Sequence, residues 1–207
     1  MTTEEKILNK ALEMFNQRGI EYVGLREIAG VLDMRVSNIT YYFPTKDDLV
    51  NRLSLELNKL NSGVVIPNKD LTILCFMYML EKVFNNHVQY RCLLLSFVHL
   101  MERNEIIAER YKKTQHNRNA TLRANLDTLT HAGYLKFKDP SASDLLVSAL
   151  ALLIRFWISE AVVSMQHLKP EDQIRHYLKL ITHLMIPYAT AKAKKEFNAF
   201  LHKPNNG

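Results

Sequence analysis

The segment Gly24–Leu49, GLREIAGVLDMRVSNITYYFPTKDDL, carries the most informative pattern in the chain. Its first part has apolar residues at the spacing of one buried helical face: Leu25, Ile28, Ala29 and Leu32. Asp33 and Met34 interrupt this pattern, and a second short helix is predicted from Val36 to Phe43. The segment therefore predicts two short helices separated by a tight turn.

Pro44 and Thr45 mark the end of the second helix and the start of a third. Proline disfavours a helical conformation in the residue before it, so the second helix should stop there. Thr45, with Asp48 three residues later, has the pattern of a capping box. Two short helices joined by a short turn form a helix-turn-helix, whose second helix fits a DNA major groove. The segment thus indicates double-stranded DNA as a partner.

Three features of roughly the first 50 residues occur in a characteristic order: RGIEYVGL at the end of an amphipathic helix, then REIA, then ITYYFPTKDDL. This order resembles the TetR family of bacterial transcriptional repressors. The resemblance implies an N-terminal helix-turn-helix, followed by a helical domain that binds an effector among its middle helices and forms a homodimer through its last two helices.

Positions that match the family's motif imply the residues that contact DNA. Base reading is carried over to Arg26, Val36, Ser37, Asn38 and Tyr41. Phosphate contact is carried over to Thr40, Tyr42 and Lys46. The family's usual Thr, Gly, Ser, Gly and Tyr are replaced here by Gly24, Asp33, Arg35, Ser37 and Thr40, respectively.

The overall positive charge is not itself evidence for DNA binding. The formal net charge is +6, yet residues 1–60 hold eight Lys or Arg against nine Asp or Glu. The basic excess lies further along, where residues 110–138 hold seven basic residues and only one acidic residue. The helix-turn-helix, with local positive charge at Arg26, Arg35 and Lys46, must therefore carry the argument for nucleic acid.

The composition, 47% hydrophobic and 23% charged, is ordinary for a soluble globular protein. The N-terminal TTEEK does not resemble a signal peptide, and the longest apolar run, residues 145–154, is too short to span a bilayer. Cys75 and Cys92 lie in apolar stretches without CxxC spacing, which predicts two reduced, buried thiols. We therefore expect a cytoplasmic protein with no membrane partner.

Helical periodicity without a strand pattern predicts an all-α fold of about nine helices. A three-helix headpiece is expected over residues 1–46 and a larger helical-bundle domain over residues 47–207, with a seam at SGVVIPN, residues 62–68. A Thr2–Glu5 capping box should start the first helix and Gly19 should end it. Further helices are expected over 70–87, 91–101, 104–131, 141–165 (opened by a Ser141–Asp144 capping box) and 170–187.

Motifs for catalysis are absent from the sequence: it has no Gly-rich phosphate loop, no HExxH and no GxSxG. His176 and His183 are spaced to share a helix face, but two ligands are too few for a metal site. We therefore expect no enzyme activity, no cofactor and no metal.

Aromatic and Met side chains are frequent in the second domain and suit an adaptable apolar cavity. Together with the resemblance they suggest an effector pocket that includes Tyr78, Phe97, Met101, Tyr111, Arg118 and Trp157. An ordinary hydrophobic core explains the same aromatic residues. If Arg118 faces inward, it favours an anionic or carbonyl-bearing effector; if it faces outward, it belongs to the basic surface.

The last predicted helix has a heptad-like apolar seam formed by Ile174, Tyr177, Ile181, Leu184 and Tyr188. Tyr188 belongs to this seam only if the helix continues past Pro187. Packing within one subunit explains the seam as well as a dimer interface does, and the family resemblance favours a homodimer.

Two functions from different classes fit these observations. The first is a ligand-responsive repressor that binds a palindromic operator as a dimer and is released by a small, largely apolar effector. The second is a helical ligand-binding or protein-interaction module whose headpiece no longer reads DNA. Specific operator binding would distinguish them.

Overall fold

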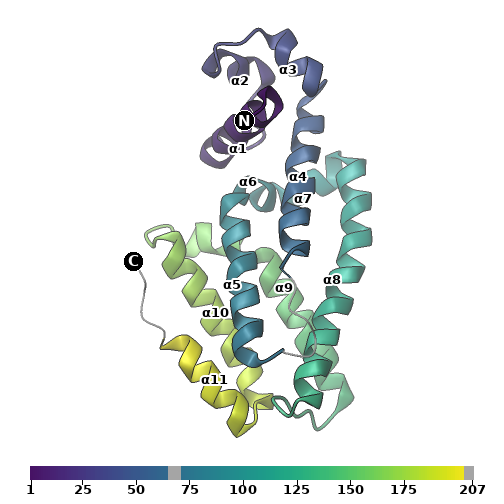
Figure 1. Ribbon diagram of the computed structural model, residues 1–207, viewed down its shortest axis with the longest axis vertical. Helices are drawn as coiled ribbons and strands as arrows, with labels where there is room; N and C mark the ends of the chain where they lie inside the picture. The colour runs from purple at the N-terminus through teal and green to yellow at the C-terminus, as the bar shows by residue number, and fades with distance from the viewer. Residues whose placement is uncertain (65–70, 203–207) are drawn as a thin grey trace. The chain divides into compact units, whose positions relative to one another are not determined.

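The computed structural model describes residues 1–64 and 71–202 of the chain. Figure 1 shows that these residues form helices joined by short connections. Within them the only β-type pairing is one isolated bridge between Leu135 and Ala189, so the predicted all-α fold is confirmed. The α-helices are α1 (Thr3–Arg18), α2 (Leu25–Val31), α3 (Val36–Tyr42), α4 (Lys46–Ser62), α5 (Ile73–Gln89), α6 (Arg91–Leu95), α7 (Phe97–Arg103), α8 (Glu105–His131), α9 (Pro140–Ser164), α10 (Pro170–Met185) and α11 (Ala191–Leu201).

Across the described residues there are eleven α-helices and one 3-10 helix, η2 (Ile186–Tyr188), where about nine helices were expected. The helix predicted over residues 91–101 is divided at Ser96, which ends α6 and begins α7. Pro187 prevents α10 from continuing, because its ring removes a backbone donor and clashes with the preceding turn. The chain therefore passes through η2 and begins a separate helix, α11.

The ends of the N-terminal helices follow the predicted caps. Thr2 and Glu5 form a reciprocal capping box at α1, and Gly19 ends that helix with a φ of 92°. Thr45 and Asp48 form the same box at α4. These three predictions are confirmed.

The start of α9 differs from its prediction. Asp139 is the N-cap, and its carboxylate accepts a hydrogen bond from the backbone N–H of Ser141 at 3.0 Å. Pro140 then occupies the first helical position, where the N–H that proline lacks is not needed. The predicted box of Ser141 with Asp144 is wrong, and Asp144 instead pairs with Arg123 of α8.

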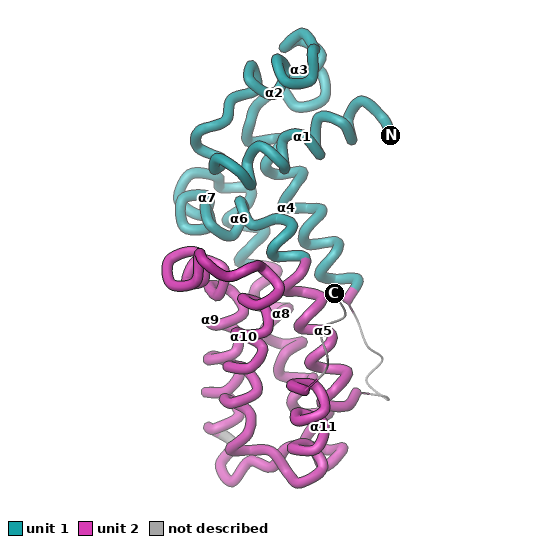
Figure 2. Tube along the Cα trace, turned by 90° about the vertical axis from the view of Figure 1, so that its left-hand side faces the viewer, with its two compact units in different colours: residues 1–63, 86–112 teal, residues 64–85, 113–207 magenta. Residues whose placement is uncertain are grey.

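Two compact units divide the chain, as Figure 2 shows by colour. Unit 1 comprises residues 1–63 and 86–112, and unit 2 comprises residues 64–85 and 113–207. Unit 1 thus holds α4, α6 and α7 in addition to the predicted headpiece of residues 1–46. The domain boundary after residue 46 stays a prediction, and residues 65–68 of the predicted seam lie outside the described residues.

The core of unit 1 joins the headpiece helices to the start of α6. Helix α1 packs against α2, α4 and α6, and its buried face includes Ile7, Ala11 and Phe15. Asn16 adds a polar link: its Nδ2 donates to Gln89 O at 2.8 Å, and its Oδ1 accepts from Cys92 N at 3.0 Å. Unit 1 is therefore stabilised by one continuous apolar core and a specific bridge from α1 to α6.

The cysteines differ in burial. Cys92 in unit 1 is buried, and this burial raises its pKa to about 12. Cys75 in unit 2 is only half-buried, so the prediction of two buried thiols is right for Cys92 alone. Both cysteines are free of disulfide bonds.

Unit 2 is a bundle in which α9 and α10 pack together. Its C-terminal helix α11 is anchored by Glu196, whose carboxylate accepts hydrogen bonds from Tyr134 Oη and Leu74 N, both at 2.9 Å. By length and composition, Ser141–Ser164 of α9 would suffice to cross a membrane, but core helices of soluble proteins meet the same criterion. Only 33% of its most apolar window is buried within the chain.

Candidate DNA-binding site

The turn between α2 and α3 is fixed by backbone geometry and by a small apolar core. Asp33 has a φ of 52°, the left-handed conformation in which glycine is most comfortable, and this explains why Gly suits the position. The next N–H, that of Met34, donates to Ala29 O at 2.9 Å. Ile28 of α2 and Ile39 of α3 are fully buried. The predicted helix-turn-helix therefore forms, with one face of α3 packed and the opposite face free.

The residues expected to read bases all lie on the surface of unit 1. Arg26 is exposed near the start of α2, and the α3 residues Ser37 and Asn38 are exposed in its first turn. Val36 is also exposed, and Tyr41 is 81% exposed. This arrangement gives α3 a surface of amide, hydroxyl and aromatic groups. Such a surface suits hydrogen bonds to base edges and apolar contact with thymine methyl groups.

The residues expected to contact phosphate are arranged less uniformly. Tyr42 is exposed, and its ring meets that of Tyr41 edge to face with centroids 5.0 Å apart. Thr40 is half-buried, and its hydroxyl donates to Ser37 O at 3.3 Å. Lys46 is also half-buried, and its ammonium is already engaged by the protein.

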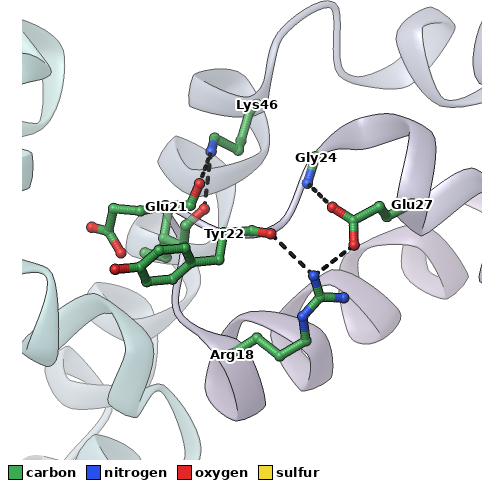
Figure 3. A network of polar contacts seen from close by, with 7 residues as sticks. Arg18, Glu21, Tyr22, Gly24, Glu27 and Lys46 are labelled. Atoms are coloured by element: carbon green, nitrogen blue, oxygen red, sulfur yellow. Dashed lines mark hydrogen bonds and ion pairs between the residues drawn. The ribbon is translucent and has the colours of Figure 1, made fainter.

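Lys46, the first residue of α4, is hydrogen-bonded to the loop between α1 and α2 (Figure 3). Its Nζ donates to Ile20 O at 2.9 Å and to Glu21 O at 3.4 Å. An ammonium carries three N–H donors, so two are directed to backbone carbonyls. In this structure Lys46 therefore positions the loop, and its phosphate contact stays a prediction.

A second set of contacts in Figure 3 fixes the start of α2, and it was not among the sequence-based predictions. Arg18 Nη2 lies 2.7 Å from Glu27 Oε2 and donates to Tyr22 O at 3.2 Å. The other oxygen of Glu27 accepts from Gly24 N at 3.3 Å. These hydrogen bonds, first from Arg18 and then from Gly24, hold the pKa of Glu27 below its ordinary value. Glu27, three residues after Gly24, was the detectable signal, because it supplies half of a capping box whose Thr is missing.

Two family models together span most of the chain. The model described as "Bacterial regulatory proteins, tetR family" matches residues 7–53, and the model described as "Bacterial transcriptional repressor" matches residues 58–197. The second match alone covers more than half of the sequence. This chain belongs to the TetR family. It is thus a helix-turn-helix transcription regulator and not an enzyme.

Two solved structures agree in fold with this TetR-family regulator, and one curated relative matches part of its sequence. A TetR-family regulator from Marinobacter aquaeolei VT8 superposes with a TM-score of 0.87 at 22% identity, covering 97% of this chain and 98% of that one. SmeT, solved in a complex with triclosan, has a TM-score of 0.62 at 13% identity, with 93% and 94% covered. The "Probable HTH-type transcriptional regulator YttP" of Bacillus subtilis is 39% identical over 56 residues. That match spans 27% of each protein, so the chain covers about a quarter of this curated relative.

The predicted effector-pocket residues of the regulator fall in separate surroundings. In unit 1, Phe97 and Tyr111 pack edge to face at 4.7 Å, and Met101 packs against the core. In unit 2, Trp157 is 1% exposed and stacks on Phe84 at 4.7 Å. Tyr78 and Arg118 are both exposed. The structure therefore pairs Phe97 with Tyr111, and it places Arg118 at the surface.

The predicted dimer seam is mostly inside the regulator's own core. Ile174, Tyr177 and Ile181 are buried within unit 2, and Ile181 has no exposed surface. Tyr188 lies in η2 beyond the end of α10, where its ring packs on Phe137 at 4.7 Å, so the condition for its place in the seam is not met. Of the five residues, Leu184 alone is exposed. Burial in the protomer leaves Ile174, Tyr177 and Ile181 little surface to offer a second subunit.

Proposed function

We propose that this regulator is a cytoplasmic repressor that binds a palindromic operator as a homodimer and releases it when a small, largely apolar effector binds. The observation that carries the proposal is the exposed face of α3, held over the buried Ile39. Ser37, Asn38 and Tyr41 present hydrogen-bonding groups there without a competing role in the core. A recognition helix with an exposed polar face can enter a major groove and contact base edges.

The decisive experiment for this function is selection of bound sequences from a random DNA pool with the full chain. We expect a symmetric consensus, because a two-fold dimer contacts two equivalent half-sites. Asn38→Ala should then cost roughly 1–3 kcal/mol on the selected operator and little on random DNA, since Asn38 would read a base. If the wild-type chain enriches no sequence, the alternative gains support: a ligand-binding or interaction module that does not read DNA.

Dimerisation is supported by an apolar surface that the protomer leaves open on α9 and α10. Leu145, Leu152 and Val163 are 70%, 60% and 75% exposed, and their spacing of seven and eleven residues places them on one face of α9. Leu180 and Leu184 are exposed one turn apart on α10. A row of large apolar side chains along one helix face differs from the singly scattered apolar residues that are normal on a protein surface. A second copy that covers this face would form the interface in place of the buried seam.

An effector site is supported by one buried polar group of unit 2. The hydroxyl of Tyr177 is buried without a hydrogen-bond partner among the described residues, and its ring lies 5.4 Å from that of Trp157. An unpaired buried hydroxyl is costly, and an effector oxygen placed there would remove that cost.

The unpaired Tyr177 hydroxyl beside the Trp157 ring favours an effector that combines an aromatic or aliphatic body with an oxygen acceptor. The SmeT complex shows that one protein of this fold is bound by triclosan. The effector would act by binding more tightly to a conformation that disfavours the operator, since only differential affinity shifts an equilibrium. Coupling of roughly 1–3 kcal/mol is typical for such systems. Thermal-shift screening of apolar compounds, followed by operator titration with each hit, tests this step. A compound that raises Tm without weakening operator binding would argue against the release mechanism.

A further inference from the structure

Arg35 stands at the start of the recognition helix, and its guanidinium makes no hydrogen bond or ion pair within the described part of the chain; its backbone carbonyl accepts from Asn38 N at 2.9 Å. It is the N-cap of α3, with backbone angles of −69° and 143°, and its side chain is exposed. The α3 residues that follow, Val36–Tyr42, include no charged side chain. The guanidinium of Arg35 is therefore the only formal charge among residues 35–42, the recognition helix and its N-cap.

The position of Arg35 has a cost for the isolated protein. A Ser, Thr, Asn or Asp at an N-cap accepts a hydrogen bond from the helix's free backbone N–H groups, and Arg cannot. No side-chain cap is present at α3, whereas α1 and α4 of the same unit have theirs. A positive charge is also disfavoured at a helix N-terminus, where the backbone dipole is positive. A side chain that disfavours its own helix and has no polar partner inside the protein is best explained by a contact outside it.

We propose that Arg35 is a specificity-determining residue that binds a guanine in the major groove of each operator half-site. The first residues of a recognition helix are those that reach base edges. The planar guanidinium matches the O6 and N7 acceptors of guanine with two parallel hydrogen bonds, which no other base offers in the same pattern. This inference rests on the operator binding proposed above. It predicts that the operator has a guanine–cytosine pair at the same position of each half-site.

The test uses the full chain, the operator found by selection, and three variants. Arg35→Lys keeps the charge but lacks the planar fork. Arg35→Ser removes the charge and supplies a cap. Lys59→Gln, at an exposed position in the last turn of α4, removes one charge elsewhere in the same unit. Each protein is titrated on the operator, on an operator with one guanine–cytosine pair replaced, and on random DNA.

For the wild type and Lys59→Gln, replacing the guanine–cytosine pair should weaken binding by roughly 5- to 150-fold per half-site. Arg35→Lys and Arg35→Ser should lose this discrimination, and Arg35→Lys should still bind random DNA like the wild type. Arg35→Ser should also raise Tm by about 2–4 °C, because it restores the cap.

Three results would overturn the inference. If both Arg35 variants weaken binding to operator and random DNA by the same factor, Arg35 contacts phosphate and reads no base. If they keep the guanine preference, another residue reads it. If both lower Tm, Arg35 has a structural partner inside the protein. A wild type without any preferred sequence would instead refute the proposed function, and this inference with it.

Discussion

Asp33 shows how a single residue carries the conformational demand of the helix-turn-helix. Its φ of 52° is unfavourable for most side chains, because Cβ approaches the neighbouring backbone. Glycine has no such penalty, and Asn and Asp tolerate the region better than other residues. The position therefore limits which substitutions the turn accepts, independently of any DNA contact.

Substitutions at Asp33 should follow this conformational order. We expect Asp33→Ala to lower the free energy of unfolding by about 1–2 kcal/mol. Asp33→Asn and Asp33→Gly should stay within about 0.5 kcal/mol of the wild type, since both tolerate positive φ. Urea denaturation of the three variants measures the order. Equal stability of the Ala and Gly variants would show that the turn relaxes and does not hold this conformation.

Glu27 gives the headpiece a pH dependence whose sign follows from its partners. Because Arg18 and Gly24 N–H favour the carboxylate, the pKa of Glu27 is lower in the folded than in the unfolded chain. Its contribution to stability is therefore present above the ordinary pKa of 4.5 and is lost as pH falls through the lower folded value. Glu27→Gln should lower Tm at pH 7, and the difference from the wild type should shrink below about pH 4.5. A pH-independent difference would assign the effect to packing and not to the carboxylate charge.

At the level of single residues, the sequence predicted the local helix caps but not the side-chain contacts between distant segments. The capping residues Thr2, Thr45 and their partners could be predicted because a cap depends only on residues within one turn. The contact of Lys46 with the α1–α2 loop could not, because it joins residues 25 or 26 positions apart in the chain. The Arg18–Glu27 ion pair joins two different helices, so a local pattern did not predict it either.

Lys46 ties the start of α4 to the loop between α1 and α2. Residues 43–45 separate the recognition helix α3 from α4, and the Lys46 ammonium fixes the start of α4 to the carbonyls of Ile20 and Glu21. Local periodicity predicted both helices, since each has a clear apolar face and a stop signal. The split of α6 from α7 at Ser96 had no such signal in the sequence, because an apolar run continues through it.

Lys46→Met should separate the positioning role of this residue from a phosphate contact. Methionine keeps the length and the apolar stem but leaves two backbone carbonyls without their donor. We expect a loss of about 1–3 kcal/mol in the free energy of unfolding. If Lys46 also contacts phosphate in the complex, the slope of log K against log salt should become shallower by about one unit per contact. Unchanged stability together with a shallower slope would mean that the loop contact is dispensable and the phosphate contact is the main role.

For the whole molecule, the distinction between core and assembly surface could not be obtained from the sequence. Heptad spacing is the same whether an apolar stripe of α10 packs on α9 of its own chain or on another subunit. The structure places Ile174, Tyr177 and Ile181 in the core and leaves Leu180 and Leu184 exposed. The fold class was predictable because it depends on many helices at once, whereas the interface depends on which side of one helix remains uncovered.

Leu152→Asp should therefore disrupt assembly without disrupting the protomer. A carboxylate at a buried apolar interface is strongly disfavoured, so the dimer dissociation constant should rise by at least about 100-fold. Ile106→Asp is a matched control, because Ile106 on α8 is 59% exposed and Leu152 is 60% exposed. Sedimentation velocity measures the association, and far-ultraviolet circular dichroism checks the fold. A Leu152→Asp chain that sediments as a dimer would exclude this face, and a monomeric wild type would exclude the dimer altogether.

The bridge made by Asn16 has a consequence for how the opening of unit 1 can be observed. The N–H of Cys92 donates to a side chain on α1, so exchange of this hydrogen with solvent requires α1 and α6 to separate, or Asn16 to rotate away. The N–H of Leu93, which donates to Tyr90 O, lies beside it and opens with the local turn. The ratio of the two exchange rates is then an internal gauge of contact between the headpiece and α6. Both amides belong to one chain in one sample, so differences in pH, temperature or protein concentration largely cancel, and a ligand that loosens this contact would be detected without any DNA present.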